Sequence, residues 1–149
     1  MGLWAKRVSA ALAALTLTAL PAIAQVPDPY AYELAQRLAN AERLLTDNGY
    51  ARAAGPFAGS LQQRGGRRFN LMLRAGQDYR IVGVCESHCA DLDMRLYDPN
   101  NQLIAQDVAQ DRVPVIHVTP TTTGNYTIEA LMYRCNAAQC WYAFNVYSR

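Results

Sequence analysis

The chain has 149 residues, of which 51% are hydrophobic and 17% are charged. This length suits a single domain that buries a real core. The 14 basic and 12 acidic side chains become 12 of each once Lys6 and Arg7 are set aside with a predicted leader, and no lysine then remains. A balanced charge argues against a nucleic-acid or anionic-membrane partner, because both require a basic excess.

Residues 1–24 have the pattern of a secretory signal peptide. Lys6 and Arg7 precede an apolar stretch, residues 8–20, and the small-residue exit Ala22-Ile23-Ala24 follows. The stretch is too short and wrongly flanked to span a bilayer. We therefore expect a mature chain, residues 25–149, that is secreted or periplasmic and has no transmembrane segment.

Residues 25–56 predict a helix followed by a linker. Asp28 is the expected cap, Pro29 suits the first turn, and Asn48-Gly49 ends the helix. The narrow apolar stripe predicts a helix that lies against the next unit, and the alternative is a helix that binds a partner. Residues 50–56 are rich in alanine and glycine, which is typical of a linker.

From residue 57 onward the hydrophobic pattern changes to period two, and turn residues separate short apolar runs. Many short strands with such punctuation predict an antiparallel β-sandwich or barrel. The expected strands are residues 69–74, 79–82, 92–97, 102–106, 113–118, 126–133 and 141–147.

Four cysteines occur as two close pairs, Cys85 with Cys89 and Cys135 with Cys140. In an exported chain this pattern predicts two local disulfides, and crossed pairing between the two loops remains an alternative. Zinc is disfavoured because the spacing, even with His88 included, matches no common module. We expect the last two strands to form a hairpin closed by the second disulfide. With Cys135 directly opposite Cys140, Ile128 and Val146 would lie on opposite faces of this hairpin, unless a one-residue bulge or an asymmetric loop reconciled them.

Three segments together resemble the bacterial pre-peptidase C-terminal (PPC) domain. They are residues 69–81 (FNLMLRAGQDYRI), 91–100 (DLDMRLYDPN) and 124–128 (GNYTI), and the match covers residues 57–149. The resemblance implies a jelly-roll β-sandwich and a non-catalytic role beside exported peptidases. Unlike the usual arrangement, no peptidase domain precedes this copy, and the cysteine loops are not part of the general pattern.

Calcium binding is the most specific chemical hypothesis, because a hard cation prefers carboxylate oxygens. Its candidate ligands are Asp91, Asp93, Asp107 and Asp111. The alternation of residues 91–96 places Asp91 and Asp93 opposite the core face, so solvated or turn-capping carboxylates are the favoured interpretation. We expect no other cofactor.

Aromatic side chains outside the inferred core face suggest a platform for a carbohydrate or another polymer. The candidates are Tyr97, Tyr133, Trp141 and Tyr147. Catalysis is disfavoured, because the histidines, His88 and His117, belong to no known catalytic motif.

The sequence thus predicts a disulfide-stapled, all-β, jelly-roll-like sandwich with a short N-terminal helix. Its expected role is that of an exported, non-catalytic binding or accessory module, with an extracellular polymer or an exported protein as partner. The alternative is an interaction subunit or inhibitor of an exported enzyme, acting through the helix or the cysteine loops.

Overall fold

The computed structural model describes residues 25–149, so the predicted signal peptide lies outside the described residues. One helix, α1 (Tyr30–Thr46), precedes eight strands. Among these residues, no helix has the length and apolar character that crossing a bilayer requires. The strands are β1 (Ala51–Leu61), β2 (Gly66–Leu73), β3 (Tyr79–Cys85), β4 (Cys89–Tyr97), β5 (Leu103–Asp107), β6 (Val115–Val118), β7 (Gly124–Cys135) and β8 (Cys140–Ser148).

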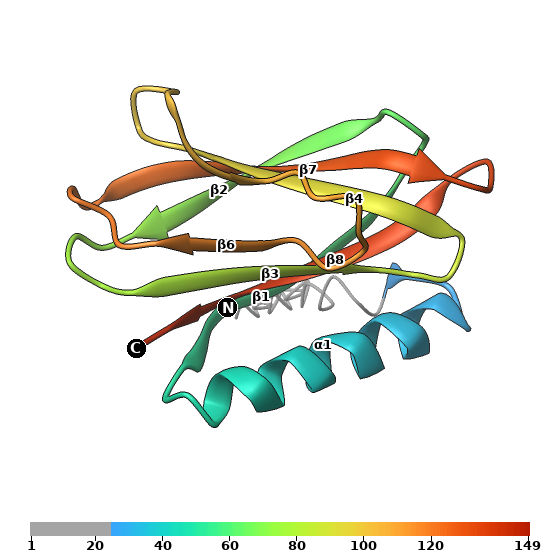
Figure 1. Cartoon of the computed structure of the whole chain (residues 1–149), viewed down its shortest axis with the longest axis horizontal. Coiled ribbons are helices and arrows are strands. Elements are labelled where there is room, and N and C mark those ends of the chain that lie inside the picture. Colours follow the sequence, from blue (N-terminus) through green and yellow to red (C-terminus); the bar gives the residue numbers. More distant parts are fainter. Residues whose placement is uncertain (1–24) are drawn as a thin grey trace, which may run out of the picture.

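The strands form two four-stranded antiparallel sheets that pack face to face (Figure 1). Sheet A has the order β1-β8-β3-β6, and sheet B has the order β2-β7-β4-β5. This order is that of an eight-stranded jelly roll, so the predicted fold class is confirmed. Because β1, β3, β6 and β8 all lie in sheet A, the chain crosses between the sheets at every connection except that from β4 to β5.

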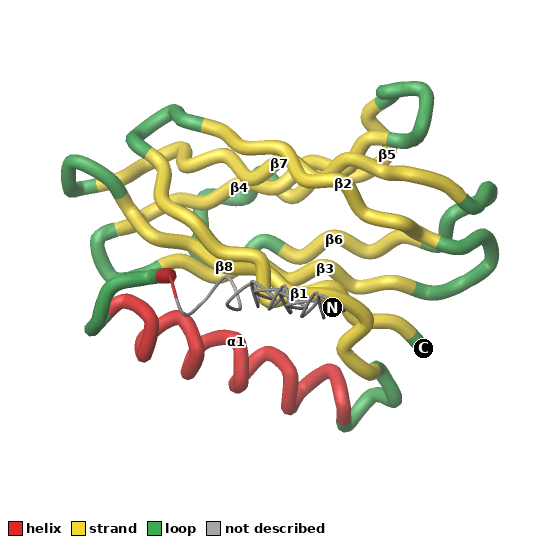
Figure 2. The backbone as a smooth tube through the Cα atoms, turned by 180° about the vertical axis from the view of Figure 1, so that it is seen from behind, coloured by secondary structure: helices red, strands yellow, loops and turns green. Residues whose placement is uncertain are grey.

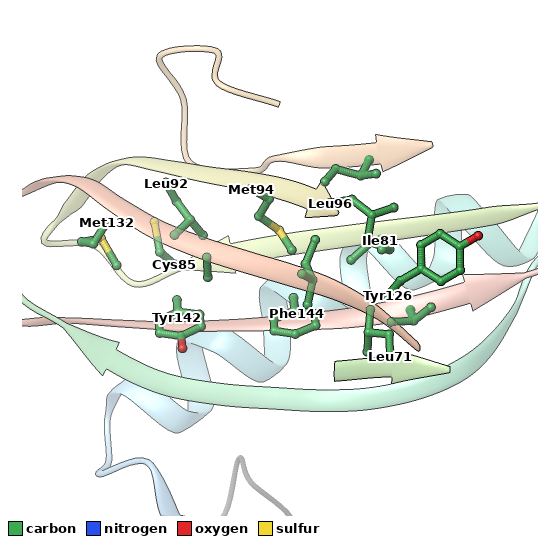
Figure 3. Packing of buried hydrophobic residues seen from close by; sticks show 14 of the residues in the cluster. Leu71, Ile81, Cys85, Leu92, Met94, Leu96, Tyr126, Met132, Tyr142 and Phe144 are labelled. Atoms are coloured by element: carbon green, nitrogen blue, oxygen red, sulfur yellow. The ribbon is translucent and has the colours of Figure 1, made fainter. Parts of the chain in front are cut away.

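Alternate residues of the strands fill the space between the sheets. On β7 the buried side chains are Tyr126, Ile128, Ala130 and Met132, while their neighbours along the strand are less buried. They meet the inward residues of β3, β4 and β8 in one hydrophobic cluster (Figure 3). A period of two is expected of strands that bury one face only, and β7 follows it over these residues.

Helix α1 covers the outer face of sheet A (Figure 2). Leu34 and Leu38 are buried there in a second cluster with Val84 and Ala143, as a helix lying against the next unit requires. Burial of one such leucine stabilises the fold by about 1.5–3 kcal/mol. The helix begins at Tyr30, with Pro29 at the N-cap position and no side-chain cap, so the expected cap by Asp28 is not formed.

Two local expectations differ from the structure. Strand β1 begins at Ala51, inside the segment expected to be a linker, and pairs with β8 across two register shifts. Small residues carry little periodicity, and the irregular backbone around Gly55 and Pro56 hides the strand from a pattern search. The last two strands do not form a hairpin, because β7 lies in sheet B and β8 in sheet A.

Candidate functional site

Two disulfides close neighbouring loops at one end of the sandwich. Cys85 is bonded to Cys89 and Cys135 to Cys140, which is the local pairing. Each bond joins the last residue of a strand in one sheet to the first residue of a strand in the other. Cys89 and Cys135 are also register partners in sheet B, so the two bonds lie side by side. The crosslinks therefore fasten the two sheets together at this end, on the right in Figure 1.

The two closed loops contact each other. The Asn136 N–H donates a hydrogen bond to the His88 carbonyl oxygen over 2.9 Å, and the Glu86 N–H donates to the carbonyl oxygen of Trp141 over 3.0 Å. All four cysteines are buried, whereas Ser87, His88 and residues 136–139 are exposed. We call this surface, residues 86–88 and 136–139, the disulfide end. It presents polar and small side chains on a backbone that covalent bonds and hydrogen bonds hold in place.

A buried carboxylate organises the first loop. Glu86 is only 1% exposed, and its Oε2 accepts hydrogen bonds from the His88 N–H (2.7 Å) and pairs with the His88 ring Nδ1 (2.9 Å). Arg112 donates from Nη2 to the Glu86 carbonyl oxygen over 2.9 Å. This arrangement fixes the orientation of the half-exposed His88 ring. Glu86 and Arg112 are not among the site residues predicted from the sequence, although a glutamate next to a cysteine in a short predicted loop is a recognisable signal.

The first turns of α1 complete the disulfide end. The Ser87 N–H donates to Glu33 over 3.1 Å, and Arg37 forms an ion pair with the same carboxylate over 2.7 Å. Burial favours the neutral form of Glu33, but the hydrogen bonds from Arg37 and Ser87 outweigh it and hold the pKa of Glu33 below its usual value. The Tyr30 ring stacks on Trp141, with ring centres 6.4 Å apart. The helix thus supports the loop through its N-terminal residues.

The structure brings the four candidate calcium ligands near one another but corrects the expected exposure of two of them. Asp91 and Asp93 lie on the outer face of sheet B, yet they are only 2% and 6% exposed. The segment from β5 to β6 runs alongside this part of β4, and the Leu92 N–H donates to the Asp111 carbonyl oxygen over 2.9 Å. Burial raises the pKa of both carboxyls, and the Asp91 charge adds to the effect on Asp93.

Asp107 and Asp111 cap turns, as the favoured interpretation expected. Asp107 accepts hydrogen bonds from the N–H groups of Ala109 (3.1 Å) and Val115 (2.9 Å), and Asp111 accepts one from Val113 (2.9 Å). In residues 25–149, no three acidic, histidine or cysteine side chains are placed so that they could hold a metal ion. The calcium hypothesis therefore gains no support from this geometry.

The four aromatic candidates do not share one surface. Tyr97 and Tyr133 lie on the outer face of sheet B, and Arg68 covers the Tyr97 ring at 4.6 Å. Trp141 and Tyr147 belong to β8 and face α1, where Tyr147 is fully buried. The prediction of a four-residue platform was wrong, because sheet A is covered on both faces and its central strand β8 is buried almost throughout.

Comparisons with known proteins leave the family open. No family profile and no curated protein matches the chain. Among solved structures, the chain is similar to that of Aeromonas hydrophila PliG, a periplasmic lysozyme inhibitor of g-type lysozyme. The identity is 14%, the TM-score is 0.47, and the match covers 67% of this chain and 86% of that chain. A likeness this weak carries no conclusion about function.

Proposed function

We propose that this chain is an exported, non-catalytic protein that binds another exported protein through its disulfide end, as an accessory subunit or an inhibitor. The observation that carries the proposal is the construction of that end. Two crosslinked loops that hydrogen-bond to each other present exposed residues on a fixed backbone. Binding through such loops loses little conformational entropy, which is what a docking surface requires.

The position of α1 favours the loops over the helix as the contact surface. Its apolar stripe is already buried against sheet A, so it is not free to enter the groove of a partner. Two disulfides also agree with export into an oxidising compartment. The resemblance to PPC domains, with the role beside exported peptidases that it implies, stays a prediction within this proposal.

A bulky substitution on the disulfide end tests the proposal. Residues 25–149 would be immobilised and exposed to the exported proteins of the source cells, and the affinity of each purified binding protein would then be measured. Ala138→Trp should weaken binding at least tenfold, because residue 138 is exposed at the loop tip. Ala75→Trp is the matched control, since this exposed alanine lies in the β2–β3 turn at the opposite end. Equal affinities for both variants would contradict the proposal.

A second candidate function is polymer binding by the outer face of sheet B. In the described part of the chain, α1 packs on sheet A and leaves this face without a helix. Tyr133 is 48% exposed there. Depletion of the protein from solution by insoluble polysaccharides or matrix proteins tests this function. Loss of depletion in Tyr133→Ala, with no effect of Ala138→Trp, would favour polymer binding over the disulfide end.

A further inference from the structure

The outer face of sheet B carries an acidic depression beside the disulfide end. It encloses about 320 Å³, and Asp91, Asp93, Gln106, Val108 and Tyr133 are among the residues that line it. Asp91 and Asp93 project from the same face of β4, two residues after Cys89 and four residues after it, respectively. The carboxylates of the depression therefore lie on the strand that begins at the first cysteine loop.

The buried carboxylates in this depression lack a cationic partner. Asp91 is 2% exposed, and its Oδ1 has no hydrogen-bond partner. Arg95 and Arg134 are close enough to influence the charges, but within residues 25–149 neither comes within 4.0 Å of a carboxylate to form an ion pair. An unpaired buried carboxylate is costly, and a cation that enters the depression would remove this cost.

The charged groups around the depression have a small excess of negative charge. The charged and titratable groups are Asp91, Asp93 and Arg95 on β4, Asp107 at the end of β5, Asp111 in the following loop, Tyr133 and Arg134 on β7, and Arg64, which lies over the Tyr133 ring. Four carboxylates thus oppose three guanidinium groups. Burial keeps the pKa values of Asp91 and Asp93 above normal, because the neighbouring guanidinium groups do not fully compensate the cost of ionising these carboxyls.

The shape and lining favour an organic cation over a metal ion. No three ligands in the described chain are arranged for a metal. The half-exposed ring of Tyr133 and the exposed Val108 add apolar surface beside the carboxylates. The Tyr133 ring already has one guanidinium nearby, that of Arg64 at 5.8 Å. A planar guanidinium binds carboxylates through paired hydrogen bonds and stacks on aromatic rings, and this depression offers both contacts.

We infer that the depression lined by Asp91, Asp93 and Tyr133 receives an arginine side chain of the protein partner. This inference deepens the proposed function and rests on it for the partner, while the depression itself can be tested alone. It adds a charged anchor beside the disulfide end, where a desolvated pair of charges would contribute specificity.

The test uses two probes that differ mainly in charge. N-acetyl-arginine methylamide and its citrulline counterpart, in which a neutral group replaces the guanidinium, would be titrated into ¹⁵N-labelled residues 25–149. We expect saturable amide shifts over residues 91–95 and 106–112 with the arginine probe, and none with the citrulline probe. Equal shifts with both probes, or no shifts with the arginine probe at about 50 mM, well above a millimolar dissociation constant, would overturn the inference.

Variants and a calcium titration complete the test. Asp91→Asn/Asp93→Asn should weaken the arginine probe at least tenfold and should fold, because it removes two unpaired buried charges. Asp47→Asn, which removes one exposed negative charge at the end of α1, should have no effect. If the double variant still misfolds, Tyr133→Ala must weaken the probe instead. Saturable shifts of the same amides by Ca²⁺ at lower concentrations than by the arginine probe would overturn the inference in favour of a metal site.

The two proposals fail in different experiments. If the arginine probe causes no shifts but Ala138→Trp still weakens partner binding, the disulfide end binds its partner without an arginine in the acidic depression. If instead Ala138→Trp leaves partner binding unchanged while the arginine probe binds, the depression is a cation site and the proposed docking surface is wrong.

Discussion

Removal of one disulfide should cost about 2 kcal/mol of unfolding free energy. Each bond closes a short loop, with sequence separations of 4 for Cys85–Cys89 and 5 for Cys135–Cys140. For loops of five or six residues, the loss of chain entropy in the unfolded state corresponds to about 2 kcal/mol at 25 °C. The four cysteines are buried, so replacement by alanine adds a small cavity, and the estimate is a lower bound.

This loss of stability converts into a measurable change of melting temperature. An unfolding entropy of about 2.1 cal/mol/K per residue over the 125 residues of the mature chain gives a decrease of about 8 °C for 2 kcal/mol. Cys85→Ala/Cys89→Ala and Cys135→Ala/Cys140→Ala would be compared with the unchanged protein by circular dichroism. The two effects should not add exactly, because the bonds are adjacent.

Hydrogen exchange would show whether the bonds also fix the loop surface. The Asn136 amide is protected by the His88 carbonyl oxygen of the other loop. In Cys85→Ala/Cys89→Ala this amide should exchange faster than it does in the unchanged protein, while amides in the centre of β7 keep their protection, measured well below the melting temperature. A melting temperature within 2 °C of the unchanged protein, with equal protection of this amide, would refute the reasoning that the crosslinks hold the disulfide end.

Two further predictions concern the helix and the carboxylates. Leu34→Ala should cost about 2–5 kcal/mol in urea unfolding, because the side chain is fully buried, whereas Leu44→Ala, which is 70% exposed, should change stability by no more than about 0.5 kcal/mol. Because burial raises the pKa of Asp93, its charge destabilises the fold at neutral pH, so Asp93→Asn should be more stable than the unchanged protein at pH 7 and equal to it below about pH 4. Asp78 is the opposite case. Burial opposes its charge, but three hydrogen bonds outweigh this effect and lower its pKa, so Asp78→Asn should be less stable at pH 7, and this difference should disappear as the pH falls through the lowered pKa.

The sequence predicted which residues form strands better than it predicted which faces are covered. Ile128 of β7 lies in the core, as the alternation of its segment predicts, because one face of sheet B meets the opposite sheet and the other is largely open. In β8 the same rule failed for Tyr147. The outward face of β8 lies under α1, so Tyr147 is buried there. A pattern search that assumes one buried face predicts that this residue is exposed.

The exposure of Asp91 and Asp93 was mispredicted for a related reason. Alternation placed both residues opposite the core, which is correct, but the segment after β5 covers that part of the sheet. The covering segment contacts β4 through Asp111, nineteen residues after Leu92 in the sequence, and its position depends on the tertiary fold. Local periodicity does not show whether another segment covers a strand face. This is why the alternation predicts a solvated strand face where the structure has two buried carboxylates.

The register conflict around the second disulfide is related to the way the chain crosses from sheet B to sheet A between β7 and β8. A hairpin between residues 126–133 and 141–147 would place Ile128 and Val146 on opposite faces, unless a one-residue bulge or an asymmetric loop reconciled them. In the structure β7 and β8 belong to different sheets that both face the core. A register shift does occur on β7, where its pairing with β4 is irregular between Met132 and Cys135. The loop between Cys135 and Cys140 crosses between the sheets, and its residues 136–139 are exposed. The disulfide joins the two ends of this loop, so the crossing that places both strands against the core also forms the surface on which the proposed docking function rests.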